Sequence, residues 1–161
     1  MQVTEHGKSL MDRVVRHTLP SINRDIMEKT GKSLLFHAYR PGRISRRIEM
    51  LKREWDIERA IEANAASLGL SGLILALLFR SWWILLLPVV ILGFLLQHAI
   101  QGWCPPVSIF RRLGMRTKEE IQFELYGLRM LKGDFDEAHE ISRMNAGDRV
   151  ERIMETLNRS I

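Results

Sequence analysis

The single cysteine of this chain is the residue whose type and surroundings best suit chemistry. Cys104 stands between Trp103 and Pro105, shortly after His98 and Gln101. Because proline suits the first turn of a helix, Cys104 is expected at the helix N-cap, where unpaired amide groups and the helix dipole favour a thiolate. Such a thiol could carry sulfur or form a mixed disulfide. The competing interpretation is that Cys104 is a small apolar residue in a turn.

The sequence gives little support for a metal or a cofactor. His98 has no second cysteine or close carboxylate at a ligand spacing, which disfavours a metal at Cys104. The acids around His139 also fit the solvated start of an ordinary helix. Residues 31–33 read Gly-Lys-Ser like the end of a phosphate loop, but Ile26 stands where that motif needs glycine. We therefore expect no metal, no cofactor and no catalytic activity of the chain's own.

A long apolar stretch before Cys104 must position this segment. From residue 63 to residue 96 only Asn64 and Arg80 are strongly polar. Extended at their ends, the two halves give about 20 residues each, or about 30 Å of helix, which is enough for a bilayer. Both halves are apolar all round, whereas a helix of a small soluble domain keeps a polar stripe. The sequence predicts two transmembrane helices in a hairpin over residues 60–100. A buried hairpin in a soluble helical protein is the competing interpretation.

Basic residues predict the orientation of the hairpin. Lysine and arginine are frequent before residue 60 and after residue 110, and only Arg80 lies between the two arms. Since cytoplasmic flanks are enriched in these residues, both termini are expected in the cytoplasm, with Arg80 at the far turn. Tryptophan rings and arginine side chains often anchor a protein at the membrane interface. The expected anchors are Trp55, Trp82, Trp83, Trp103, Arg111 and Arg112.

Small residues predict how the two arms pack. Ala65 and Gly69 stand four residues apart, as do Gly72 and Ala76, and Gly93 offers a matching small site on the second arm. Small residues at this spacing let helix backbones approach closely. We expect this face to contact the second arm, although it could also form a homodimer.

Both flanks are predicted to be helical. Residues 1–42 suggest short helices with a stop near Gly31, and residues 43–59 a basic amphipathic helix that continues into the first span. That helix is either a solvated connector or a surface-lying or partner-binding element. Residues 101–116 predict an end of the second span at Gly102, then a Trp-Cys-Pro turn and a short helix flat on the membrane. The apolar face of that helix is expected to be Val107, Ile109, Phe110 and Leu113. Residues 117–161 predict a C-terminal flank that begins with a capping box from Thr117 to Glu120.

Net charge and cysteine count limit the classes of binding partner to expect. The formal net charge of +5 is mixed with acids, which suits anionic headgroups better than a nucleic-acid groove. One cysteine excludes an intramolecular disulfide. The expected partners are the lipid bilayer, a second copy of the chain and an unknown cytoplasmic protein, without nucleic acid.

These residues also carry a family resemblance. The elements in order are Ile57-Glu58-Arg59, a glycine-bearing span, a turn followed by tryptophan, an apolar second span, and then Gly102-Trp103-Cys104-Pro105 and Arg112-Leu113-Gly114. Over roughly residues 55–117 this order resembles the YgaP-like inner-membrane transmembrane domain. That family is largely of unknown function and is best known as the membrane part attached to a rhodanese. The resemblance implies a hairpin in the bacterial inner membrane, as a monomer or a dimer, with Cys104 at the family's Cys-Pro position. The N-terminal flank is short and has no cysteine, so sulfurtransferase activity is not implied.

The sequence thus predicts an all-α membrane hairpin with cytoplasmic amphipathic helical flanks. Its expected role is that of a membrane anchor or protein-interaction module. The alternative is a thiol or persulfide carrier that works through Cys104 in sulfur or redox metabolism. A third interpretation is a hairpin that bends membranes.

Overall fold

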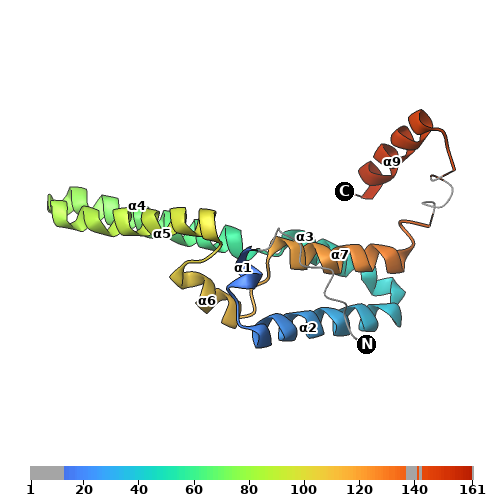
Figure 1. Cartoon of the computed structure of the whole chain (residues 1–161), viewed down its shortest axis with the longest axis horizontal. Coiled ribbons are helices and arrows are strands. Elements are labelled where there is room, and N and C mark those ends of the chain that lie inside the picture. The colour runs from blue at the N-terminus through green and yellow to red at the C-terminus, as the bar shows by residue number, and fades with distance from the viewer. Residues whose placement is uncertain (1–12, 137–140, 142, 161) are drawn as a thin grey trace. The chain divides into compact units, whose positions relative to one another are not determined.

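The structure is a computed structural model that describes residues 13–136, 141 and 143–160. Within these residues every regular element is a helix and no strand occurs, which confirms the all-α class (Figure 1). In chain order the elements are α1 (Arg13–Arg16), α2 (Pro20–Ala38), the 3-10 helix η2 (Pro41–Arg43), α3 (Ile44–Arg53), α4 (Ile57–Phe79), the 3-10 helix η3 (Trp82–Leu85), α5 (Leu86–Gln101), α6 (Pro105–Arg112), α7 (Lys118–Lys132) and α9 (Ala146–Ser160).

The chain divides into two compact units. The described residues among 1–29 and 54–121 form unit 1, and those among 30–53 and 122–161 form unit 2. Unit 1 contains α1, the hairpin of α4 and α5, and α6. Unit 2 contains α3 and α9, whereas α2 and α7 contribute residues to both units.

Helices α4 and α5 run side by side in opposite directions as the predicted hairpin (Figure 1). The helical segments that end at Phe79 and Gln101 are long and apolar enough to cross a membrane. Arg80 ends α4 in the left-handed conformation, with φ of 49°, and its amide N–H donates to the carbonyl of Ala76. The turn therefore falls at Arg80 and Ser81, where the sequence predicts it.

Small residues bring the two arms together along part of the predicted face. Gly72 is buried, and a Cβ atom there would lie 3.0 Å from Cδ of Pro88. Ala65 and Ala76 on the same helix are also buried. By contrast, Gly69 and Gly93 have no atom within 4 Å of an added Cβ. The close approach is thus made at Gly72 rather than along the whole small-residue pattern.

We expect Gly72→Val to destabilise the hairpin by about 1–3 kcal/mol more than Gly69→Val. The rigid ring of Pro88 meets the new side chain at position 72, whereas position 69 faces open space. Both substitutions change helix propensity in the same helix by a similar amount, so the difference reports packing. Reversible unfolding in detergent micelles, followed by circular dichroism, measures it. Equal losses for the two variants would contradict the close contact.

The outer surface of the hairpin is apolar. Large apolar side chains are exposed along both arms of the hairpin. They include Leu70, Leu77, Leu78, Phe79, Val89, Leu92 and Leu96. A surface helix of a soluble protein normally turns charged or polar residues outward. An apolar surface of this extent on a folded protein marks an interaction site with lipid or protein.

The helix before the hairpin is not continuous with it. The sequence predicts a helix over residues 43–59 that runs into the first span, but α3 ends at Arg53 and α4 begins at Ile57. Asp56 caps α4, because its carboxylate accepts the amide N–H of Arg59 at 2.7 Å. The amide N–H of Ile57 donates to the carbonyl of Arg116 at 2.9 Å. A local cap and a tertiary hydrogen bond therefore interrupt the helix where neither glycine nor proline does.

Helix α2 shows the opposite difference. The sequence predicts a stop near Gly31, yet α2 continues through this residue to Ala38. In unit 2, Leu34 packs against Gly127 of α7, where a Cβ atom would lie only 2.9 Å from the leucine side chain. Thr30 and His37 are buried on the same helix. Packing of the residues that follow Gly31 thus offsets the low helix propensity of glycine, which costs about 1 kcal/mol.

Candidate functional site

The cysteine lies where the sequence places it along the chain. Helix α6 begins at Pro105, and Cys104 is its N-cap residue in an extended conformation. The side chain makes no capping hydrogen bond, and the residue is only 2% exposed. It packs in an apolar cluster of unit 1 that contains Val14, Ile57, Ile61 and Val107.

This burial acts against a thiolate. Removal of the thiol from water raises the pKa of Cys104 above its ordinary value, and the backbone N–H of Val107 opposes this change by less. The direction is opposite to the one expected from the helix N-cap alone. Desolvation prevails here because an apolar cluster surrounds the sulfur, and the Val107 N–H at the helix end only partly offsets it. The geometry favours the interpretation of Cys104 as a small apolar residue.

We expect a small maleimide to label Cys104 in the folded protein more slowly than in the urea-unfolded protein at the same pH. The thiolate is the reactive form, and burial makes it both scarcer and less accessible. Because the folded-state pKa is raised, the stability gained from burying the thiol is present below the unfolded pKa and is lost as the pH rises through the folded one. Labelling rates of the folded and the unfolded protein, measured across alkaline pH, test whether the thiol of the folded protein ionises at a higher pH. Rapid labelling of the folded protein at neutral pH would contradict it.

The polar residues predicted around the thiol, His98 and Gln101, are not gathered at it. Cys104 and Pro105 line a small apolar cavity of about 230 Å³ together with Asn64, whereas His98 lines a different cavity. Gln101 is exposed at the end of α5. Trp103 is half-buried beside the cysteine in the chain. The structure therefore assembles no catalytic group around Cys104 from this set.

The predicted interface anchors have different surroundings. Trp82 and Trp83 are exposed at the turn of the hairpin, with their rings stacked at 4.0 Å between centroids. Trp55 is exposed and lies under the guanidinium of Arg59, 4.6 Å from the ring centroid. Arg112 is also exposed, as an anchor must be. Arg111 is the exception, because it is buried and the expectation that it anchors the protein at the membrane is wrong.

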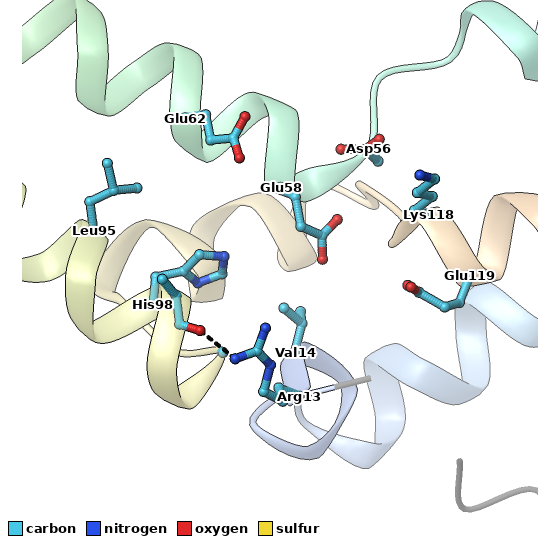
Figure 2. A pocket seen from close by; sticks show the side chains of 11 residues that line it. Arg13, Val14, Asp56, Glu58, Glu62, Leu95, His98, Lys118 and Glu119 are labelled. Carbon is cyan, nitrogen blue, oxygen red and sulfur yellow. Dashed lines mark hydrogen bonds between the residues drawn. The ribbon is translucent and has the colours of Figure 1, made fainter. Parts of the chain in front are cut away.

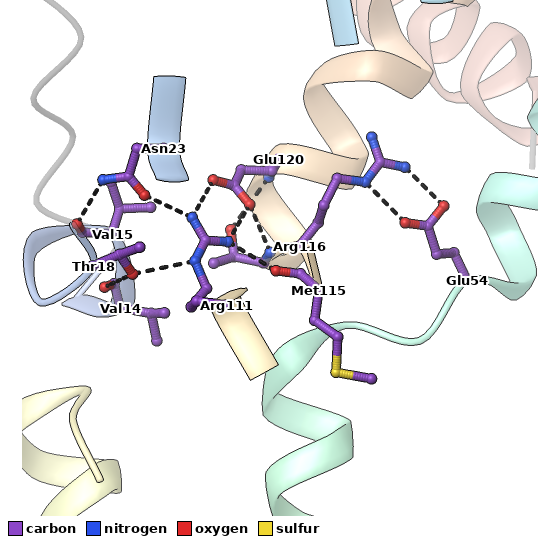
Figure 3. A network of polar contacts seen from close by, with 10 residues as sticks. Val14, Val15, Thr18, Asn23, Glu54, Arg111, Met115, Arg116 and Glu120 are labelled. Carbon is purple, nitrogen blue, oxygen red and sulfur yellow. Dashed lines mark hydrogen bonds and ion pairs between the residues drawn. The ribbon is translucent and has the colours of Figure 1, made fainter. Parts of the chain in front are cut away.

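Arg111 is buried inside unit 1, with 1% of its surface exposed. Its guanidinium binds both carboxylate oxygens of Glu120, at 2.6 and 2.8 Å (Figure 3). It also donates to the hydroxyl of Thr18 at 3.1 Å, to the side-chain carbonyl of Asn23 at 2.7 Å and to the backbone carbonyl of Met115 at 3.1 Å. All the donors of the guanidinium are thereby used. The side chain cannot reach a lipid headgroup in this arrangement.

A periodic signal in the sequence could have located this arginine. Cys104, Val107 and Arg111 are spaced by three and four residues, so they share one face of α6, and all three are buried. The predicted apolar face was instead Val107, Ile109, Phe110 and Leu113, of which only Val107 is buried. The acid that pairs with the arginine, Glu120, could not be identified from spacing in α6 alone, because it belongs to α7.

Glu120 has a second role that the sequence does predict. Its carboxylate accepts the backbone N–H of Thr117 at 2.9 Å, while the backbone N–H of Glu120 donates to the hydroxyl of Thr117 at 3.3 Å. This reciprocal pair is the predicted capping box at the start of α7. A further ion pair nearby joins Arg116 to Glu54 at 2.7 Å. Unit 1 thus holds the segments around its hairpin by polar contacts to arginine side chains.

A second cavity of unit 1, of about 430 Å³, lies beside the end of α5 (Figure 2). His98 is buried at its wall, and its Nδ1 has no hydrogen-bond partner in the described part of the chain. Arg13 donates to the backbone carbonyls of Ala99 and Ile100, two of the last carbonyls of α5. Carboxylates and an imidazole in one cavity can exchange protons with water. The charged residues that line it are Arg13, Asp56, Glu58, Glu62, Lys118 and Glu119.

Gly102 makes the wall of this cavity possible. It ends α5 in the left-handed conformation with φ of 74°, as the sequence predicts for a residue that terminates the span. A Cβ atom there would lie 2.8 Å from the backbone carbonyl carbon of Arg13. Glycine is therefore required both by the backbone conformation and by the close approach of α1.

The described residues contain no group of three or more histidine, cysteine, aspartate or glutamate side chains that could hold a metal ion. His139, around which the sequence places a disfavoured metal site, lies outside the described residues. Comparison with protein families, with curated proteins and with solved structures finds no match to the chain. The YgaP-like resemblance therefore stays a prediction from the residues that carry it.

Proposed function

We propose that the protein is a membrane-anchored hairpin that serves as an anchor or protein-interaction module, in the bacterial inner membrane with both termini cytoplasmic. The observation that carries this proposal is the outward apolar surface of α4 and α5, which form a hairpin yet leave most of their large side chains exposed. Lipid would cover this surface without any further protein. Each exposed leucine that is buried in this way contributes about 1.5–3 kcal/mol.

The two ends of the hairpin support the proposed orientation. The turn carries only one charge, Arg80, beside the exposed and stacked pair Trp82 and Trp83, which suits a membrane interface. At the other end, the polar networks of Arg111 and Arg116 hold the segments next to the hairpin.

Single-cysteine labelling in intact cells tests the topology. In a Cys104→Ser background, a cysteine at Ser81 should react with a membrane-impermeant maleimide from outside the inner membrane. A cysteine at the exposed Ser45 on α3 should react only after the membrane is permeabilised. The protein should also stay in the membrane pellet after alkaline extraction. Release into the supernatant, or labelling of the Ser45→Cys variant from outside, would contradict the proposal.

The geometry gives less support to the thiol or persulfide carrier considered from the sequence. A thiol or persulfide carrier needs an accessible and ionisable sulfur, whereas Cys104 is buried with a raised pKa.

Trimming the C-terminal helix α9 tests the interaction role. Its exposed apolar residues include Val150 and Met154, so loss of a co-purifying partner without loss of membrane attachment is the expected result.

A further inference from the structure

Unit 2 contains a basic cavity of about 470 Å³ that the proposed anchoring role does not use. Its wall is formed by Phe36 and His37 of α2, by Arg43 at the end of η2, and by Arg46 and Arg47 in the first turn of α3. The three arginines are spaced by three and one residues. Residues at positions i, i+3 and i+4 share one side of a helical turn, which explains why three guanidinium groups border the same space.

Only one of these arginines is neutralised by an acid that the structure shows. Nε and Nη2 of Arg47 bind the two carboxylate oxygens of Glu124 at 2.9 and 3.0 Å. Glu124 is fully buried, and it also accepts the hydroxyl of Ser33 at 2.6 Å. Its carboxylate is thus engaged on both oxygens, and it is not among the residues that line the cavity.

The other two arginines leave positive charge at the cavity. Arg43 and Arg46 are exposed, and neither forms an ion pair in the described part of the chain. Arg43 lies 6.0 Å from the ring centroid of Phe36, which also carries the guanidinium of Arg40 at 4.4 Å. Like charges that share one cavity repel each other unless an anion lies between them.

His37 also lines the cavity. It is buried, and its Nδ1 lies 2.7 Å from the backbone carbonyl of Ser33. A carbonyl only accepts hydrogen bonds, so Nδ1 carries the hydrogen, and Nε2 of the neutral ring is an acceptor. The donors to an anion in this cavity are therefore the arginines, and no carboxylate lines it.

We propose that this cavity binds a phosphate group. Arginine guanidinium groups match phosphate oxygens in geometry and form strong charge-assisted hydrogen bonds with them. The cavity volume exceeds the roughly 30 Å³ that one water takes in the liquid by a wide margin, so a phosphate and part of its organic substituent fit. The phosphate could belong to a lipid headgroup or to a soluble phosphorylated molecule. The inference does not depend on the hairpin crossing a bilayer, because residues of unit 2 alone form the cavity.

The test uses the full chain in neutral detergent micelles, with inorganic phosphate as the first probe. Arginine side chains labelled with 15N report binding through their Nε–H signals. Arg46→Gln should weaken phosphate binding by about three- to tenfold, because it removes one exposed charged donor. Arg53→Gln is the matched control, since Arg53 is exposed on the same helix but does not line the cavity. It should change binding less than twofold, and neither variant should alter the thermal unfolding midpoint.

A second set of measurements identifies the source of the phosphate. The same signals are recorded in nanodiscs of phosphatidylcholine with and without phosphatidylglycerol. A response to inorganic phosphate in micelles supports a soluble ligand, and a response only to the anionic lipid, lost in Arg46→Gln, supports a headgroup. The proposal is overturned if neither probe moves the signals, or if Arg53→Gln weakens binding as much as Arg46→Gln. Membrane attachment is measured separately by alkaline extraction, so failure of the anchoring proposal remains distinguishable.

Discussion

Replacement of Arg111 by methionine is expected to lower the free energy of unfolding by about 3–5 kcal/mol. The substitution keeps the apolar stem and removes the guanidinium, which leaves the buried carboxylate of Glu120 without its cation. Thr18, Asn23 and Met115 lose a donor at the same time. The loss is large because removal of one member of a buried ion pair leaves the other charge buried without a partner, at the full cost of its desolvation. Urea unfolding in detergent, followed by helical circular dichroism, gives the value.

Two controls separate this pair from general damage to α6. Arg112→Met changes the neighbouring arginine, which is exposed, and should shift stability by no more than about 0.5 kcal/mol. The double variant Arg111→Met with Glu120→Gln removes the unpaired charge and keeps a residue suited to the capping box. It should be more stable than Arg111→Met alone. A loss for Arg112→Met as large as that for Arg111→Met would refute the central position of Arg111.

The second large effect is expected in unit 2. Glu124→Gln should destabilise the protein by about 1–3 kcal/mol, because a neutral amide cannot replace a carboxylate that pairs with Arg47 and accepts from Ser33. The loss is smaller than for Arg111 because the side chain of Arg47 remains 26% exposed and can be hydrated. Thermal unfolding in the same detergent measures it.

The matched control for this change is Glu119→Gln. Glu119 lies on the same helix as Glu124 but is exposed, so its replacement should leave the unfolding midpoint within about 2 °C of that of the parent protein. If both variants lose the same stability, burial of the Glu124 ion pair does not account for the effect. A Glu124→Gln variant that unfolds like the parent would show that the pair contributes nothing net.

Features of the structure that depend on local backbone chemistry could be predicted from the sequence. The capping box of Thr117 and Glu120, the N-cap position of Cys104 before Pro105, and the end of α5 at Gly102 are all found where the residue types place them. The turn at Arg80 is correct for the same reason. These features arise from side chains and backbone groups within a few residues of one another, so tertiary context has little to override.

Helix boundaries that depend on tertiary contacts were less predictable. The break before α4 combines the local cap of Asp56 with the hydrogen bond between Ile57 and Arg116, which are 59 positions apart in the chain. The continuity of α2 through Gly31 depends on packing of Leu34 against α7. Propensity alone gives the wrong result in both places. The energies involved, about 1 kcal/mol, are small enough for a few tertiary contacts to reverse.

The sequence by itself determined the all-α class and the apolar hairpin, because an uninterrupted apolar surface and its flanking charges are properties of composition and order. Only the tertiary structure decided which charged residues are buried. Arg111 and Arg112 are adjacent and chemically identical in the chain, yet one is enclosed by Thr18, Asn23 and Glu120 while the other is exposed. The environment of Cys104 was decided in the same way. Its ionisation depends on the apolar residues that the fold brings around the sulfur, and the helix N-cap, although correctly predicted, is the weaker of the two influences.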